Sequence, residues 1–143
     1  MRGDAPREQE GKKSDMDKIQ QVHALRGDPD VHYNCCQSVL IPFAPECGLD
    51  RGKAGALGAH FGGGMRHGGT CGAVTGALMV LGMAGKDESA AKAFMKAFRD
   101  KNGCLECAGL LKKAVECGED RKCHCDRMVI EAVELVEEAL RER

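Results

Sequence analysis

Residues 70–85 form the longest apolar stretch of the chain, and glycines interrupt it at helical spacing. Gly72 and Gly76 lie four positions apart, so a helix through this stretch would carry both on one face. Without side chains at those points, the backbone of a second helix can approach closely. The stretch is too short and too rich in glycine to span a membrane. It therefore predicts the central, tightly packed helix of a helical protein.

Apolar residues on both sides of this stretch also recur at helical spacing. Asn34 is a good N-cap for a helix over residues 34–42, and further amphipathic patterns cover residues 87–101, 104–115 and 124–141. No segment shows sustained alternation of polar and apolar residues between hairpin turns. The sequence therefore predicts an all-α, single-domain bundle of five or six helices, with a Gly-rich loop at residues 62–69 before the central helix.

The balance of charge argues against two large classes of partner. Lys and Arg number 21 and Asp and Glu 22, so a net charge of −1 provides no field for nucleic acid or an anionic membrane surface. Aromatic residues make up only 3% of the chain and Trp is absent, so platforms for stacking bases are missing as well. We expect neither nucleic-acid binding nor membrane insertion.

The start of the chain is polar and charged without periodicity. We expect a disordered segment over residues 1–15 and one Cys-rich helical redox domain over residues 16–143. The segment lacks the apolar core of a secretory signal, which predicts a cytoplasmic, reducing location. Nine cysteines in such a compartment are typical of metal ligands or redox thiols rather than disulfides. Their odd number also prevents complete pairing within one chain.

Helical geometry separates cysteines that face the interior from those that face solvent. If the last helix is continued towards its N-terminus with the period of its apolar residues, Cys125 lies on the apolar face with Met128. Cys123 then lies roughly 200° from Cys125 around the helix axis. Cys107 shares a face with the apolar Leu111. We therefore predict that Cys107 and Cys125 point inward and that Cys123 points towards solvent.

Two further cysteines follow residues that can cap a helix. Cys35 follows Asn34 and Cys71 follows Thr70, so both would occupy the first turn of a helix. Backbone N–H groups converge there, which lowers the pKa of a thiol and favours thiolate, and we expect this effect at Cys71. Four cysteines from four different helices could thus meet inside the bundle: Cys35, Cys71, Cys107 and Cys125.

Four thiols gathered in an apolar interior favour a metal centre. Buried thiolates are costly unless a cation neutralises them, and four of them match an iron–sulfur cluster first and a tetrahedral zinc second. The alternative is that each is a small buried hydrophobic residue, as free cysteines often are. Glycines beside the site would let the chain approach and donate N–H groups to sulfur: Gly63, Gly64, Gly69 and Gly72.

A second interpretation uses a dithiol. Cys104 and Cys107 form a CxxC pair at an expected helix start, so Cys71 or Cys104 would attack a disulfide and Cys107 would resolve the mixed disulfide. Covalent c-type haem is not expected, because Ala108 stands where a CxxCH motif needs histidine. A third interpretation is an interaction module in which zinc only holds helices together. The roles of the other cysteines stay open: Cys36, Cys47, Cys104, Cys117 and Cys123.

Three motifs resemble a known family. Tyr33–Leu40 (YNCCQSVL), Phe61–Met65 (FGGGM) and Cys71–Leu78 (CGAVTGAL) are similar to segments of the redox-active family named for its C…GCAxxG…C…C cysteine pattern. The similarity runs from about Gln20 to Leu140. It implies four shared cysteines, which fall here on the set already chosen from helix faces: Cys35, Cys71, Cys107 and Cys125.

A related domain in split-Soret cytochrome c extends this resemblance. That protein carries haem and an iron–sulfur centre and is dimeric, so the likeness implies an iron–sulfur site here and raises the option of a homodimer. Genes of the family tend to lie near oxidoreductase or transporter genes, which implies an accessory role beside a redox partner protein or oxidoreductase. We therefore expect an electron-transfer or redox-sensing protein rather than a stand-alone enzyme.

Overall fold

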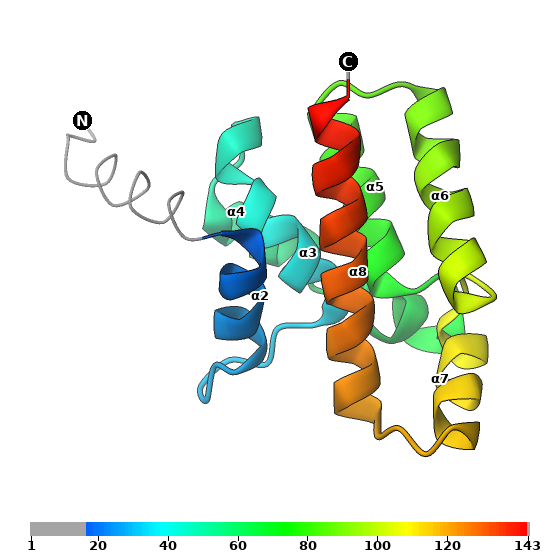
Figure 1. The fold of residues 1–143 in the computed structure, drawn as a ribbon. Helices are drawn as coiled ribbons and strands as arrows, with labels where there is room; N and C mark the ends of the chain where they lie inside the picture. The colour runs from blue at the N-terminus through cyan, green and yellow to red at the C-terminus, as the bar shows by residue number, and fades with distance from the viewer. Residues whose placement is uncertain (1–16, 143) are drawn as a thin grey trace.

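Seven α-helices follow one another in the part of the chain that the computed structural model describes, residues 17–142 (Figure 1). They are α2 (Lys18–Arg26), α3 (Cys35–Phe43), α4 (Arg51–Leu57), α5 (Gly72–Met83), α6 (Glu88–Asn102), α7 (Cys107–Glu116) and α8 (Arg121–Arg141). Two shorter turns, η1 (Pro45–Cys47) and η2 (Gly64–Gly68), join them. The all-α prediction is confirmed, with one helix beyond the expected five or six. The segment 1–15, which we expected to be disordered, lies outside the described residues.

Short polar side chains begin five of these helices. At each N-cap an Asp or Asn side chain accepts a hydrogen bond from the backbone N–H three residues later: Asp17, Asn34, Asp50, Asp87 and Asp120. Each such cap stabilises its helix by about 1 kcal/mol. The helix boundaries are therefore largely encoded by the local sequence.

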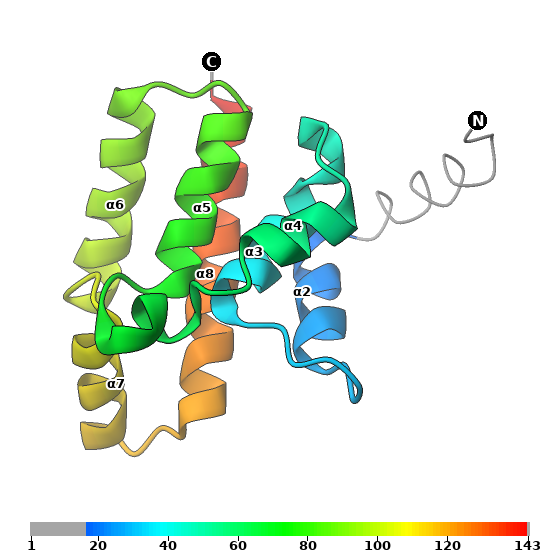
Figure 2. The ribbon, with the colours of Figure 1, turned by 180° about the vertical axis from the view of Figure 1, so that it is seen from behind.

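Helices α5 and α8 run side by side through the middle of the molecule, with α6 and α7 on one side and α2, α3 and α4 on the other (Figures 1 and 2). Helix α8 contacts α2, α3, α5, α6 and α7, and α5 contacts α3, α6 and α8. Their apolar faces form a large part of the core, which includes Val74, Val80, Met128, Val129 and Val133. The stretch at residues 70–85 is thus a core helix, as predicted. No helix among residues 17–142 has the length and apolar character needed to cross a membrane.

Two glycines let α3 lie directly against α5. A Cβ atom on Gly76 would lie 2.7 Å from the carbonyl oxygen of Cys36. A Cβ atom on Gly72 would lie 2.8 Å from the carbonyl oxygen of Phe61 and 3.1 Å from the backbone nitrogen of Cys36. Real Cβ atoms do not approach other atoms so closely, so any larger residue would push the helices apart. This close packing brings the first turn of α3 beside the first turn of α5.

The Gly-rich segment before α5 is more ordered than the loop that we expected. Part of it forms the irregular turn η2, in which Gly63, Gly64 and Gly68 have left-handed φ angles of 63–79°. Met65 and Arg66 also adopt positive φ values, which are uncommon for residues with side chains. The turn returns the chain so that Gly69 N–H donates to the Gly64 carbonyl at 2.8 Å. Glycine makes this reversal possible at little steric cost.

Candidate functional site

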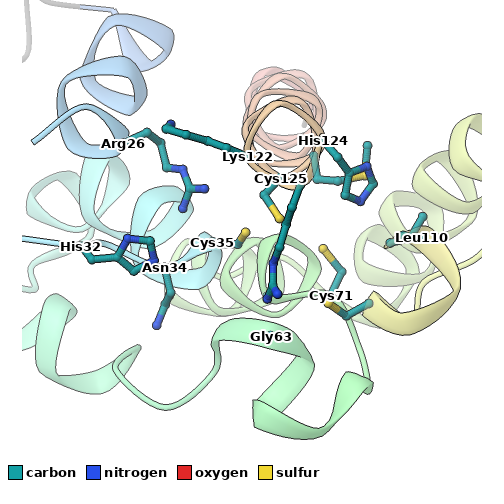
Figure 3. A pocket seen from close by; sticks show the side chains of 14 residues that line it. Arg26, His32, Asn34, Cys35, Gly63, Cys71, Leu110, Lys122, His124 and Cys125 are labelled. Carbon is teal, nitrogen blue, oxygen red and sulfur yellow. The ribbon is translucent and has the colours of Figure 1, made fainter. Parts of the chain in front are cut away.

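One cavity of about 370 Å³ lies where the first turns of α3, α5, α7 and α8 meet (Figure 3). All four cysteines chosen from the sequence line it: Cys35, Cys71, Cys107 and Cys125. Apolar side chains of Leu110 and Met128 complete the wall together with polar and basic residues. Thiols that are far apart in the sequence therefore share one space, although their role as ligands stays a prediction.

Each of the four cysteines is placed by the start of a helix. Cys35 is the first residue of α3, behind the Asn34 cap, and Cys107 is the first residue of α7. Cys71 stands immediately before α5 and is itself the N-cap residue, so the expected cap at Thr70 is wrong. Cys125 lies one turn into α8. Helix starts thus place the four cysteines around one cavity.

Backbone hydrogen bonds hold two of the cysteines side by side. The N–H of Cys71 donates to the carbonyl of Leu105 at 2.8 Å, and the N–H of Cys107 donates to the carbonyl of Gly69 at 2.6 Å. Thr70 and Glu106 form an antiparallel bridge between the same two segments. This short ladder couples the start of α5 to the start of α7 and fixes Cys71 next to Cys107.

The four glycines predicted to serve the site play different parts. Gly63 and Gly72 line the cavity, whereas Gly64 and Gly69 do not. A Cβ atom on Gly64 would lie 2.7 Å from the Cβ of Cys107 and 2.5 Å from the Gly69 carbonyl oxygen. Gly64 therefore allows η2 to lie against Cys107, and Gly69 supplies the carbonyl that orients that residue.

Cys35 and Cys125 form a hydrogen-bonded pair across the cavity. The Cys35 thiol donates to Cys125, which raises the pKa of Cys35 and lowers the pKa of Cys125 to about 6. Burial opposes the change at Cys125, while the positive charges of Arg26 and Arg121 favour it. Of the two thiols, Cys125 is therefore the one that ionises more readily.

The expectation of a thiolate at Cys71 is wrong for the metal-free site. Burial raises the pKa of Cys71 to about 11, and the backbone amides of Ala73 and Val74 only partly oppose this effect. Burial also raises the pKa of Cys107. Desolvation of the charged form therefore outweighs the helix N-terminus at these positions.

Basic side chains also line the cavity, and the sequence did not single them out. Arg26, Arg121 and Lys122 lie in its wall, and none of the lining residues is Asp or Glu. Arg26 donates to Asp126 at 2.7 Å, and Lys122 donates to the other oxygen of the same carboxylate at 2.9 Å. The spacing of four between Arg121 and Cys125 was a signal that could have placed Arg121 on the same face of α8.

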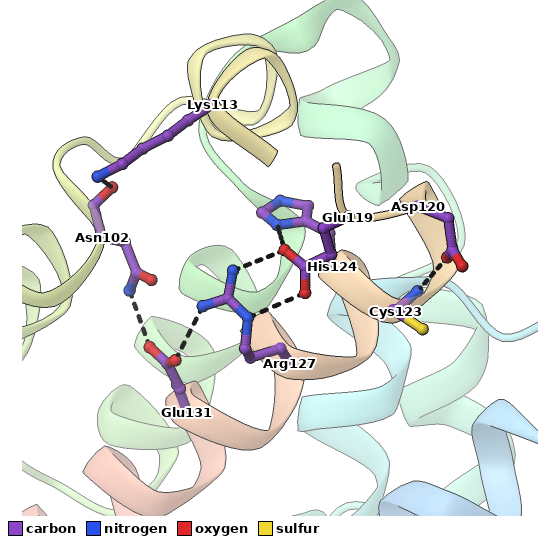
Figure 4. Close-up of polar contacts among 8 residues, drawn as sticks. All are labelled: Asn102, Lys113, Glu119, Asp120, Cys123, His124, Arg127 and Glu131. Atoms are coloured by element: carbon purple, nitrogen blue, oxygen red, sulfur yellow. Dashed lines mark hydrogen bonds and ion pairs between the residues drawn. The ribbon is translucent and has the colours of Figure 1, made fainter. Parts of the chain in front are cut away.

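A network outside the cavity holds two carboxylates, one that precedes α8 and one within it (Figure 4). Arg127 bridges Glu119 at 2.9 Å and Glu131 at 3.2 Å. His124 is buried between this network and the cavity, with Nδ1 3.7 Å from Glu119 Oε1. Burial lowers the pKa of His124, against the effect of the Glu119 charge. The network thus keeps two carboxylates away from the thiols.

The five remaining cysteines lie outside the cavity. Cys123 and Cys117 are exposed, and Cys47 is half-buried in η1. Cys36, the second residue of α3, is buried, and burial raises its pKa to about 12. Cys104 precedes α7 rather than starting it, with its Sγ 3.8 Å from the Glu106 carbonyl oxygen. The predicted CxxC pair is therefore divided, with only Cys107 in the cavity.

Comparison with known proteins gives one match. A family model described as "Putative redox-active protein (C_GCAxxG_C_C)" matches residues 33–139, a span that includes all four cavity cysteines. No curated protein and no solved structure matches the chain.

Proposed function

Because the chain belongs to the redox-active C_GCAxxG_C_C family, we propose that its cavity binds an iron–sulfur cluster for electron transfer or redox sensing. The ligands would be Cys35, Cys71, Cys107 and Cys125. One observation carries the proposal, which is that thiols from four separate elements line a single cavity. Thiolates are the usual protein ligands of such clusters.

The donor set suits a group with several metal atoms better than a single ion. Among the described residues, no three His, Cys, Asp or Glu side chains are arranged as a site for one metal ion. A zinc ion needs its four sulfur atoms within about 2.3 Å of one point. Four thiols around a cavity of about 370 Å³ are more compatible with a larger group that each of them can reach.

The charges around the cavity also favour an anionic centre. Four thiolates would concentrate negative charge, and Arg26, Arg121 and Lys122 would offset part of it. The apolar Leu110 and Met128 would limit the access of water. The bound cluster would supply one-electron chemistry, and a partner redox protein or oxidoreductase in the cytoplasm would exchange the electrons.

Metal and sulfide analysis of protein purified without oxygen tests the proposal. We expect iron and acid-labile sulfide in equal amounts, with visible sulfur-to-iron absorption. Protein that binds neither, even after incubation with ferrous iron and sulfide under reducing conditions, would contradict it. Stoichiometric zinc without iron would instead support the zinc-stabilised interaction module.

The hydrogen bond between Cys35 and Cys125 favours a second candidate, thiol–disulfide exchange. The Cys125 thiolate would attack a low-molecular-weight disulfide and release one thiolate. Cys35 would then lose its proton, attack the sulfur of Cys125 and release the second thiolate. Two thiols are oxidised to one disulfide, and the small disulfide is reduced to two thiols.

This candidate differs from the pairing that we predicted, in which Cys71 or Cys104 attacks and Cys107 resolves the mixed disulfide. Metal-free protein can be treated with a small disulfide, and the protein disulfides that form can be mapped by mass spectrometry. The map distinguishes a bridge between Cys35 and Cys125 from a bridge to Cys107. We expect a bridge between Cys35 and Cys125 to form first. Equal rates of oxidation at both pairs would remove the support that the hydrogen bond gives to this candidate.

A further inference from the structure

Arg121 differs from Arg26 and Lys122 in having no carboxylate partner among residues 17–142. Arg26 and Lys122 share Asp126, so two positive charges there meet one negative charge. Among the described residues, no hydrogen bond or ion pair joins Arg121 to any Asp or Glu. Its interactions are with thiols, since it hydrogen-bonds to Cys125 and its charge also acts on Cys107.

The position of Arg121 runs against the usual preference at a helix start. It is the first residue of α8, and the first turn of that helix contains no acidic residue. Positive side chains are disfavoured at a helix N-terminus, because the helix dipole is positive there. The Asp120 carboxylate caps this helix start, and the Cys125 side chain one turn on is the cavity thiol whose pKa is lowered.

Arg121 also acts across the cavity, not only on its own helix. Its guanidinium helps to lower the pKa of Cys125 on α8, and it offsets part of the rise that burial causes in the pKa of Cys107 on α7. Arg26 is less suited to such a role, because it is already held by Asp126 and by the carbonyl of Tyr33. Within the described part of the chain, Arg121 is therefore a cation of the cavity wall without a carboxylate partner, although the charge of Arg26 also acts on Cys125.

We propose that Arg121 is the charge-compensating residue that stabilises the reduced, more negative form of the cysteine-bound centre. The inference rests on the proposed function, because it concerns the charge of the same four thiols. Uptake of one electron adds one negative charge and breaks no bond. A nearby cation favours that uptake, so removal of the cation makes the midpoint potential more negative.

Redox titration of reconstituted protein with dithionite as the electron donor tests this role. We expect Arg121→Met to lower the midpoint potential and Arg121→Lys to remain close to the unmodified protein. Lys122→Met is the matched control, since Lys122 lies in the same helical turn and lines the same cavity, but pairs with Asp126. Equal shifts in Arg121→Met and Lys122→Met, or no shift in either, would overturn the proposal.

Alkylation of metal-free protein gives a second readout that does not depend on a cluster. Iodoacetate, an anion, and iodoacetamide, which is neutral, both react with the thiolate form of cysteine. The rate with iodoacetate divided by the rate with iodoacetamide at Cys125 therefore reports the local charge, because the ionised fraction cancels. We expect Arg121→Met to lower this ratio about fivefold, as the loss of one unit charge a few ångströms away predicts. If no cluster forms but the ratio falls, the proposed function fails while the charge effect stands. A ratio that falls no more in Arg121→Met than in Lys122→Met would contradict the role of Arg121.

Discussion

Cys123 and Cys125 lie two residues apart at the start of α8, yet only Cys125 lines the cavity, while Cys123 is exposed to solvent. The difference follows from the helical period, which turns successive side chains by about 100°. The two residues therefore make a matched pair for testing whether the cavity is the site of metal binding.

Substitution of Cys125 by Ser should remove most of the bound iron and sulfide, because a hydroxyl is a poor ligand for a soft metal centre. The same substitution at Cys123 should leave both contents unchanged. Iron and acid-labile sulfide are measured on protein purified without oxygen, and circular dichroism shows whether the helices are retained. Greater loss in Cys123→Ser would mean that the site lies elsewhere on α8.

The close packing of α3 on α5 predicts a stability difference between two glycines of one helix. Gly76→Ala places a methyl group 2.7 Å from the Cys36 carbonyl oxygen and should destabilise the fold by about 1–3 kcal/mol. Gly82 has no atom within 4 Å of the corresponding position. Gly82→Ala should therefore be neutral or stabilise by up to about 1 kcal/mol, through helix propensity. Urea unfolding of both variants measures the difference, and equal free energies of unfolding would refute the packing argument.

Gly64, the first residue of η2, and Gly63 before it differ in whether a methyl group would contact other atoms, a site cysteine among them. Gly63 and Gly64 both have positive φ, so alanine at either position costs about 1–2 kcal/mol. Only at Gly64 would the new methyl group meet Cys107, because no atom lies within 4 Å of the corresponding position at Gly63. Gly64→Ala should unfold at a lower urea concentration than Gly63→Ala, because its methyl group also meets the Gly69 carbonyl oxygen at 2.5 Å, and it should bind less iron per folded molecule. Equal iron content would show that Cys107 tolerates displacement or does not bind.

The buried thiols predict that metal-free protein loses stability at alkaline pH. Burial raises the pKa of Cys36 to about 12 and that of Cys71 to about 11. In the unfolded chain these thiols ionise near pH 8.5, so above about pH 8.5 the native state retains protons that the unfolded state has released. The free energy of unfolding should therefore be constant with respect to these groups below that pH and fall above it.

Urea unfolding of metal-free protein between pH 7 and pH 10 would measure this dependence. Cys36→Ala should make the alkaline decline less steep, because it removes one group with a raised pKa. Cys117→Ala provides the control, since Cys117 is exposed. A slope that does not respond to Cys36→Ala would assign the decline to other groups.

Local sequence patterns predicted much of the fold and the positions of the cavity cysteines. The period of α8 distinguished Cys125 from Cys123, and the spacing of Gly72 and Gly76 indicated that another helix would lie against α5. These features depend on helical geometry alone. The role of the cysteines as ligands was predicted from chemistry and awaits the metal analysis.

Features that depend on contacts distant in sequence were not predictable. Arg26 reaches Asp126 only because α2 packs against α8, and no local pattern indicates that pairing. The pKa of Cys71 was misjudged because the helix N-terminus is visible in sequence, whereas the degree of burial is not. The segment that carries Cys104 and Cys107 is held by the backbone of Cys71 and Gly69, and no local pattern indicates this contact.

The ladder that joins the segment before α5 to the segment before α7 has a mechanical consequence. It connects the glycine turn directly to a cysteine of the cavity, through the Gly69 carbonyl and the Cys107 amide. Any event that reshapes this turn on the outer surface would be transmitted to the sulfur atoms without passing through the hydrophobic core. A protein that docks on the turn could thereby sense, or alter, the state of the interior.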